Sequence, residues 1–192
     1  MSTALFCGVL AFALMLAFDC RKAAGKQRGN GALFAAGLLL LAGTTLWLLF
    51  PLVGRMNGWR IASGVWALAW LAALLYVLFF ALPAGDVYGE QQSLSVCTAG
   101  AYALCRHPGG WCLLFANLGL WGLAGTARMG VGALAFSALN FLYILLQDRF
   151  LFPRYIAGYK EYRAQTPFLL PNRRSIAACF SGKGEDQGNR KA

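Results

Sequence analysis

Five stretches of this chain contain no Asp, Glu, Lys, Arg or His, and each is too long to be a single strand. They cover residues 2–18, 31–53, 61–83, 111–126 and 131–146. A helix needs about 20 apolar residues to cross the hydrocarbon core of a bilayer. Because lipid offers no hydrogen-bond partners to the backbone, such spans fold as helices. We expect an all-α, polytopic membrane helix bundle of about five spans.

The last two spans are the shortest, and only Arg128 marks the turn between them. We expect a tight helical hairpin, with one re-entrant element as the alternative. Gly119, Gly122 and Gly125 recur every three residues, a spacing that lets helices approach closely. The N-terminus lacks the basic start of a secretion signal, so it is expected to be a retained first span. We expect one membrane domain over residues 1–180 and a disordered polar tail over 181–192.

The distribution of basic residues predicts the orientation. Of 17 Lys and Arg residues, 14 fall on one side if the N-terminus is outside: four between 19 and 30, Arg106, and nine from Arg149 onward. The positive-inside bias therefore places the N-terminus outside and the C-terminus in the cytoplasm. The chain is expected in the bacterial inner membrane, with its net charge of +10 facing anionic lipid rather than nucleic acid. The segment after the last span is expected to lie along the cytoplasmic surface as an amphipathic element.

Cysteine spacing gives no sign of a metal site. The six cysteines form no CxxC pair, and His107 is the only histidine. Most of the cysteines fall on or near the cytoplasmic side, where reduced thiols are the rule. We expect no bound metal.

Two polar segments lie at the ends of spans. The first contains Arg106-His107-Pro108, and the second begins with Gln147-Asp148-Arg149. Proline suits the first turn of a helix, which predicts His107 near the N-cap of the fourth span. Pro153 should end or kink the helix that leaves the membrane. Either these groups form an interfacial active site, or His107 and Arg106 are only a polar cap and an anchor for lipid phosphate.

The two segments together resemble the isoprenylcysteine carboxyl methyltransferase family, whose relatives include the membrane phospholipid methyltransferases. The sequence from Gly100 to Pro108 is similar to the family element Gly-x-Tyr-x-x-x-Arg-His-Pro. A paired site at the end of the last span, then Tyr-x-x-Tyr, then Pro follow in the family. Gln147-Asp148, Tyr159 with Tyr162, and Pro171 stand in those places. The similarity covers about residues 94–171.

This resemblance implies an integral-membrane methyltransferase that uses S-adenosylmethionine on a lipophilic substrate, admitted from the bilayer. It implies that Arg106 holds an anionic substrate group and that Asp148 stands close to the chemistry. Because methyl transfer to a carboxylate or thiolate needs no proton removal at the transition state, such acceptors are favoured over amines. The implied cofactor-binding residues are Cys97, Tyr102, His107, Pro108, Gly109, Gly110 and Gln147.

The chain departs from the family at two positions. Gly110 replaces the usual Tyr, and Gln147 replaces the first Glu of the pair. Both family residues suit a sulfonium, which is a cation. Trp111 and Asp148, each one residue away, are candidate substitutes, although a shift of one residue on a helix turns the side chain by about 100°. Gln147→Glu is expected to restore the charge and tighten cofactor binding. Two alternatives stay open: a diverged, weakly active or inactive relative that binds a lipid or nucleotide, and a structural or transport membrane protein.

Overall fold

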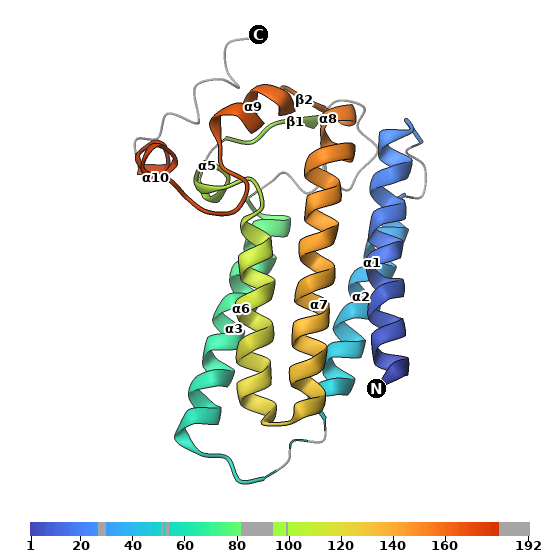
Figure 1. Cartoon of the computed structure of the whole chain (residues 1–192), viewed down its shortest axis with the longest axis vertical. Coiled ribbons are helices and arrows are strands. Elements are labelled where there is room, and N and C mark those ends of the chain that lie inside the picture. The colour runs from blue at the N-terminus through green and yellow to red at the C-terminus, as the bar shows by residue number, and fades with distance from the viewer. Residues whose placement is uncertain (27–29, 51, 53, 82–93, 99, 181–192) are drawn as a thin grey trace.

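The protein is an all-α bundle whose long helices lie side by side (Figure 1). The structure is a computed structural model, and it describes all residues except 27–29, 51, 53, 82–93, 99 and 181–192. The predicted tail 181–192 lies outside the described residues. The long helices are α1 (Ser2–Ala23), α2 (Asn30–Leu49), α3 (Gly58–Phe79), α6 (Pro108–Ala124) and α7 (Ala127–Leu146).

These helices match the five predicted spans. Within the described residues, four helical segments are long and apolar enough to cross a membrane: α1, α2, α3 and the continuous run Ala127–Tyr155 that begins with α7. The fifth span, α6, has 17 residues and is about 25 Å long at 1.5 Å per residue.

The two last spans form the predicted hairpin rather than one re-entrant element. Gly125 ends α6 in the left-handed region at φ 68°, a conformation that glycine adopts without strain. Thr126 then begins α7, where its side chain accepts a hydrogen bond from the Met129 backbone N–H.

Small residues on α6 allow it to pack closely against α3. A Cβ atom at Gly119 would lie 2.8 Å from the Ala67 backbone nitrogen, and one at Gly122 would lie 2.5 Å from Ser63 Oγ. Gly119 and Gly122 therefore serve helix packing, as expected, whereas Gly125 ends α6 and a Cβ atom there would have nothing within 4 Å. At the far end of the same pair, Arg60 Nε donates to the Leu123 carbonyl at 2.7 Å and caps α6.

The other end of the bundle carries the short elements. A two-residue parallel pair joins β1 (Leu94–Ser95) to β2 (Ile156–Ala157). Three short helices lie near it: α5 (Ala101–Leu104), α8 (Phe152–Tyr155) and α9 (Tyr159–Gln165). A helix α10 (Arg173–Phe180) follows. Pro153 is predicted to end or kink the helix that leaves the membrane, but the helical run passes Pro153 and ends two residues beyond it, at Tyr155. A π-helical turn, η1 (Gln147–Leu151), directly precedes α8.

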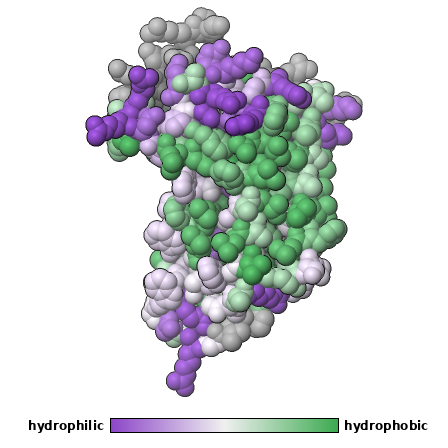
Figure 2. Space-filling model, viewed as in Figure 1, coloured by the Kyte–Doolittle hydropathy of each residue, from purple (hydrophilic) through white to green (hydrophobic). Residues whose placement is uncertain are grey.

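The surface divides along the long axis. Figure 2 shows a broad hydrophobic band over the helices and a hydrophilic cap at the end that carries α8 and α9. The apolar side chains exposed on the band include Leu39, Val65 and Leu68. The N-terminus lies at the opposite end from the cap (Figure 1). These features agree with a polytopic membrane bundle whose polar site is at one end.

Candidate active site at one end of the bundle

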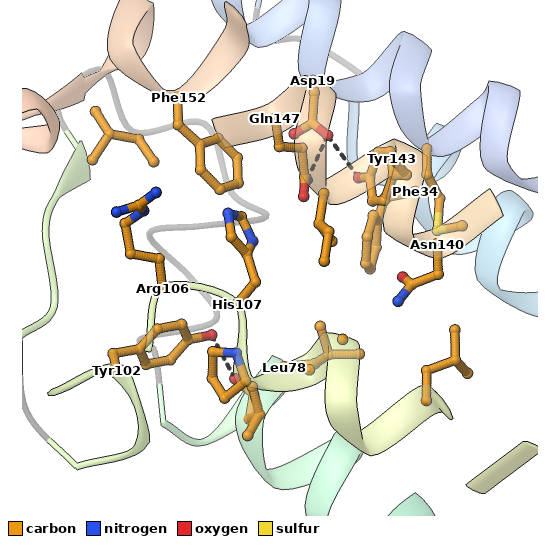
Figure 3. A pocket seen from close by; sticks show the side chains of 18 of the residues that line it. Asp19, Phe34, Leu78, Tyr102, Arg106, His107, Asn140, Tyr143, Gln147 and Phe152 are labelled. Atoms are coloured by element: carbon orange, nitrogen blue, oxygen red, sulfur yellow. Dashed lines mark hydrogen bonds between the residues drawn. The ribbon is translucent and has the colours of Figure 1, made fainter. Parts of the chain in front are cut away.

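A cavity of about 250 Å³ opens among the helices at the capped end (Figure 3). Its size is close to the lower end of the roughly 300–1,000 Å³ typical of small-molecule sites. Eight of the nine predicted site residues line it: Cys97, Tyr102, Arg106, His107, Pro108, Gly109, Gly110 and Gln147. The ninth, Asp148, hydrogen-bonds to His107 and Arg106 on the cavity wall. The fold thus brings both predicted polar segments to one place.

The segment that carries Arg106 and His107 is held on two sides. His107 is the N-cap of α6 and Pro108 its first residue, as predicted. The Arg106 backbone N–H donates to the Pro167 carbonyl at 3.0 Å. Tyr162 Oη donates to the Tyr102 carbonyl at 2.6 Å. The C-terminal segment therefore fixes the loop that precedes α6.

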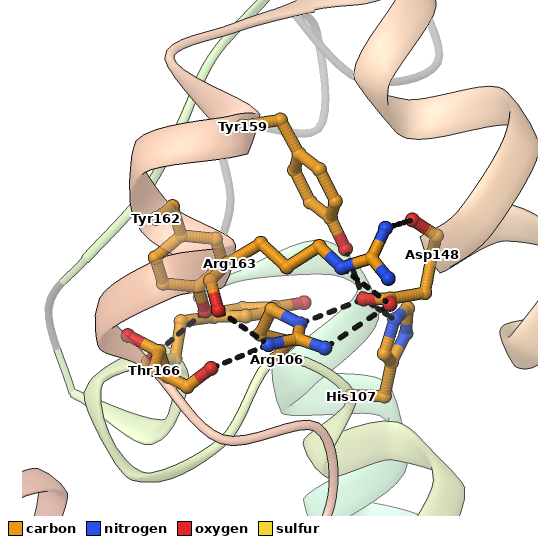
Figure 4. Close-up of polar contacts among 8 residues, drawn as sticks. Arg106, His107, Asp148, Tyr159, Tyr162, Arg163 and Thr166 are labelled. Carbon is orange, nitrogen blue, oxygen red and sulfur yellow. Dashed lines mark hydrogen bonds and ion pairs between the residues drawn. The ribbon is translucent and has the colours of Figure 1, made fainter.

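An ion-pair cluster centres on Asp148, and we call it the Asp148 cluster (Figure 4). Arg106 donates to both carboxylate oxygens, from Nε at 2.7 Å and from Nη2 at 3.0 Å. Tyr159 Oη donates to Oδ1 at 2.7 Å, and Arg163 Nε lies 3.7 Å from Oδ2. The Arg106 and Asp148 side chains are only 8% and 3% exposed. A bidentate pair of this kind fixes both side chains.

The remaining bonds of Arg106 bear on its expected role as an anion holder. Its Nη1 donates to the backbone carbonyls of Arg163 at 3.0 Å and Thr166 at 2.5 Å. Four donations to protein groups leave one N–H of the guanidinium for a ligand. This geometry suits a residue that positions the loop better than one that binds an anion, and the anion-holding role stays a prediction.

His107 lines the cavity (Figure 3) and also contacts Asp148 (Figure 4). Its Nε2 lies 3.3 Å from Asp148 Oδ1, so we assign the proton to Nε2, which leaves Nδ1 as an acceptor. The ring stacks on Phe152, with centroids 5.8 Å apart. Burial lowers the pKa of His107, against the opposing effect of Asp148. The imidazole is therefore neutral at pH 7.

The neighbouring phenols and thiol are also kept uncharged. Burial raises the pKa of Tyr159 and of Tyr162 well above the usual value for tyrosine. Burial raises the pKa of the Cys105 thiol to about 11. These side chains act as hydrogen-bond donors or packing groups, and Cys105 is not a nucleophile.

A second carboxylate lies in the cavity wall, and sequence reasoning missed it. Asp19 of α1 is 2% exposed and accepts three hydrogen bonds, in what we call the Asp19 cluster (Figure 3). Tyr143 Oη donates to Oδ2 at 2.6 Å, Gln147 Nε2 to Oδ2 at 2.8 Å, and Tyr155 Oη to Oδ1 at 3.0 Å. One signal was present: Asp19 is the only acidic residue among the first 85. An ionisable residue within a span is a functional candidate.

The Asp19 cluster gives Gln147 a different role from the one expected from the sequence. Gln147 and Asp148 are consecutive residues of η1 and point to different partners: Gln147 faces Asp19, and Asp148 faces Arg106. The amide of Gln147 is a donor to a carboxylate, so the glutamate that the resemblance led us to expect here would meet Asp19 directly. The expectation that Gln147→Glu restores a missing charge is at odds with this geometry, because Asp19 already supplies a carboxylate at that place.

Trp111 does not take the place of the tyrosine missing at Gly110. Its Nε1 donates to the Leu169 carbonyl at 2.8 Å, and its ring stacks on Phe115. Gly110 itself lines the cavity, where a Cβ atom would lie 3.0 Å from Ile144 Cδ1. A large side chain at Gly110 would therefore have to displace Ile144.

No group of three or more His, Cys, Asp or Glu side chains among the described residues could hold a metal ion. All six cysteines are free thiols. The chemistry that these residues offer is a neutral imidazole, a carboxylate in an apolar cavity, and aromatic rings.

Comparisons with known proteins give two distant relatives. The chain is 29% identical over 163 residues to a methanethiol S-methyltransferase of Crocosphaera subtropica. The aligned region covers 76% of this chain and 61% of that protein. It is 38% identical over 85 residues to the cobalt-zinc-cadmium resistance protein CzcN of Cupriavidus metallidurans. That aligned region covers 42% of this chain and 38% of the relative. The chain thus spans less than two thirds of either relative. No protein-family model matches the chain, and no solved structure matches it.

Proposed function

We propose that this protein is an integral-membrane, S-adenosylmethionine-dependent methyltransferase that acts on a lipophilic substrate. One observation carries the proposal: the residues that resemble the methyltransferase motifs lie some 40 positions apart and yet line one cavity. Similarity to a protein named methanethiol S-methyltransferase supports the same reaction class. It also favours a thiol over a carboxylate as the methyl acceptor.

The cavity residues fit the proposed cofactor by their chemistry. S-adenosylmethionine carries a sulfonium, an amino acid group and an adenine ring. Asp19 offers a negative charge, and the rings of Phe34 and Phe152 offer faces for stacking. Gly109 and Gly110 line the cavity in the first turn of α6 and add no side chains to it.

The chain's own residues would act mainly by positioning and by excluding water. The bound cofactor supplies an electrophilic methyl group, and transfer to a sulfur or oxygen nucleophile is an in-line displacement. The Asp148 cluster holds the loop before α6 in place, and the apolar wall keeps water away from the reacting atoms. His107, neutral and with Nδ1 as acceptor, is placed to take the proton of a thiol.

Binding and transfer can be tested on detergent-purified protein. We expect calorimetry to detect binding of S-adenosylmethionine to the protein. We expect mass spectrometry to detect methylation of a long-chain alkanethiol but not of the matched alkylamine. His107→Asn keeps the polar contact and is expected to lower turnover. Absence of cofactor binding would reject the proposal, whereas binding without turnover on any acceptor would indicate the diverged, inactive relative.

We further propose that the N-terminus is outside and the site faces the cytoplasm of a bacterial inner membrane. Cys20 is exposed at the capped end of α1, and Arg55 is exposed between α2 and α3 at the far end. On a background without other cysteines, Cys20 should react with an impermeant maleimide only after lysis. Arg55→Cys, the matched reporter, should react in intact cells. The reverse pattern would overturn this orientation.

A further inference from the structure

Asp19 stands out among the described residues because its carboxylate is buried without a cationic partner. Its three donors, Tyr143, Gln147 and Tyr155, are all neutral. Where both partners are described, the ion pairs converge on Asp148, and in that part of the chain no Lys or Arg nitrogen lies within ion-pair distance of Asp19. Lys22, one turn along α1, acts on Asp19 only through its longer-range field, and its Nζ lies over the Phe18 ring.

A buried carboxylate held only by neutral groups is costly while it is ionised, and a positive charge beside it offsets that cost. Asp19 lines the cavity, so a ligand in the cavity can reach it. The same wall presents several aromatic rings, whose faces attract cations. Aromatic residues that line the cavity with Asp19 include Phe12, Phe18, Phe34, Tyr143, Phe152 and Tyr155. The wall is therefore suited to a cationic ligand group.

The hydrogen bonds of Asp19 also indicate which kind of cation fits. A carboxylate has about four acceptor positions. Oδ2 accepts from Tyr143 and Gln147, and Oδ1 accepts from Tyr155, so about one position is left. An ammonium group brings three donors, and Asp19 has only about one acceptor position left for them. A sulfonium brings charge and no donor, and it needs only a negative charge and aromatic faces.

We propose that Asp19, oriented by Tyr143, Gln147 and Tyr155, is the counter-charge for a sulfonium and makes the site select S-adenosylmethionine over its neutral thioether product. This assignment rests on the proposed function and adds the residue that distinguishes substrate from product. Product S-adenosylhomocysteine keeps the amino acid and adenosine parts and lacks the charge on sulfur. Loss of that charge removes the attraction to Asp19, which favours product release.

The test compares the affinities of S-adenosylmethionine and S-adenosylhomocysteine in wild type and in Asp19→Asn. Asparagine fits the same space and can accept from Tyr143 and Gln147, so the variant should fold. We expect Asp19→Asn to lose about tenfold or more in affinity for S-adenosylmethionine and less than about threefold for the thioether. Equal losses for both ligands, or no loss for either, would overturn the assignment.

Asn140→Ala is the matched control, because Asn140 is a neutral polar residue of the same cavity. Its effect should fall equally on both ligands. If Asp19→Asn does not fold, the ratio of the two affinities in the wild-type protein is the remaining test of the assignment. A preference of about tenfold or more for the sulfonium supports the assignment, and a preference below about threefold refutes it. Absence of binding to wild type would refute the proposed function itself, which separates the two failures.

Discussion

Asp148 and Asp19 are equally buried, at 2% exposure, and both accept hydrogen bonds from tyrosines at the same end of the bundle. Their partners differ in charge. Asp148 has Arg106 on both of its oxygens, with Arg163 nearby, whereas Asp19 has neutral donors only. Asp148 connects the end of α7 to the loop before α6 and to α9. Asp19 faces the cavity from α1.

This difference separates a positioning role from a binding role. A carboxylate already paired with arginine has little attraction left for a ligand cation, and removing it would leave a buried positive charge. A carboxylate held by neutral donors keeps its charge available to a ligand, and neutralising it removes no ion pair. The same residue type therefore serves the fold in one cluster and, as we propose, ligand selection in the other.

The same substitution in both clusters should give the largest contrast. Asp148→Asn leaves Arg106 buried without its counter-charge and is expected to lower the free energy of unfolding by about 3–5 kcal/mol. Asp19→Asn retains hydrogen-bond partners and should cost about 1 kcal/mol or less. Denaturation of the two detergent-solubilised variants measures both. Equal costs would remove the distinction between the clusters.

Gln147→Glu should put a second carboxylate against Asp19. The substitution replaces a donor 2.8 Å from Oδ2 with an acceptor. We expect a loss of about 1–3 kcal/mol in unfolding free energy and no gain in S-adenosylmethionine affinity. Gln147→Leu, which removes the donor without adding charge, is the control. Tighter cofactor binding in Gln147→Glu would show that Gln147, not Asp19, faces the cation.

Tyr155→Phe tests the outermost donor of Asp19. Its bond to Oδ1 is 3.0 Å long and Tyr155 is only half-buried, so we expect a cost of about 1 kcal/mol. Tyr159→Phe makes the matching deletion at Asp148, where the bond is 2.7 Å long and both residues are buried. It should cost more. A larger loss for Tyr155→Phe in thermal unfolding would contradict this ranking.

Titration of His107 should leave the free energy of unfolding unchanged at neutral pH and lower it in acid. Burial lowers the pKa of His107 below the ordinary 6.5. Below pH 6.5 the unfolded chain takes up a proton that the folded chain does not, so stability falls as pH falls through this window. We expect His107→Asn to lose this part of the pH dependence in unfolding curves between pH 7 and pH 5. The same slope in wild type and variant would show that His107 is not the group responsible.

The sequence alone predicted features that depend on neighbouring residues. Uncharged runs predicted the spans, and Pro108 predicted His107 at a helix N-cap. Each follows from local sterics or from the cost of burying charge in lipid. The motif residues also came together, because the resemblance carries a three-dimensional arrangement that spacing cannot supply.

Only the tertiary structure decided which partner each polar side chain has. Asp19 meets Tyr143 across 124 positions of sequence, and Arg106 meets Asp148 across 42. The adjacent residues Gln147 and Asp148 join different clusters, and Trp111 turns to Leu169 instead of the cavity. Hydropathy and helix periodicity describe one segment at a time. Pairing between distant segments depends on how the helices pack and rotate against one another, so it appears only when the whole bundle is assembled.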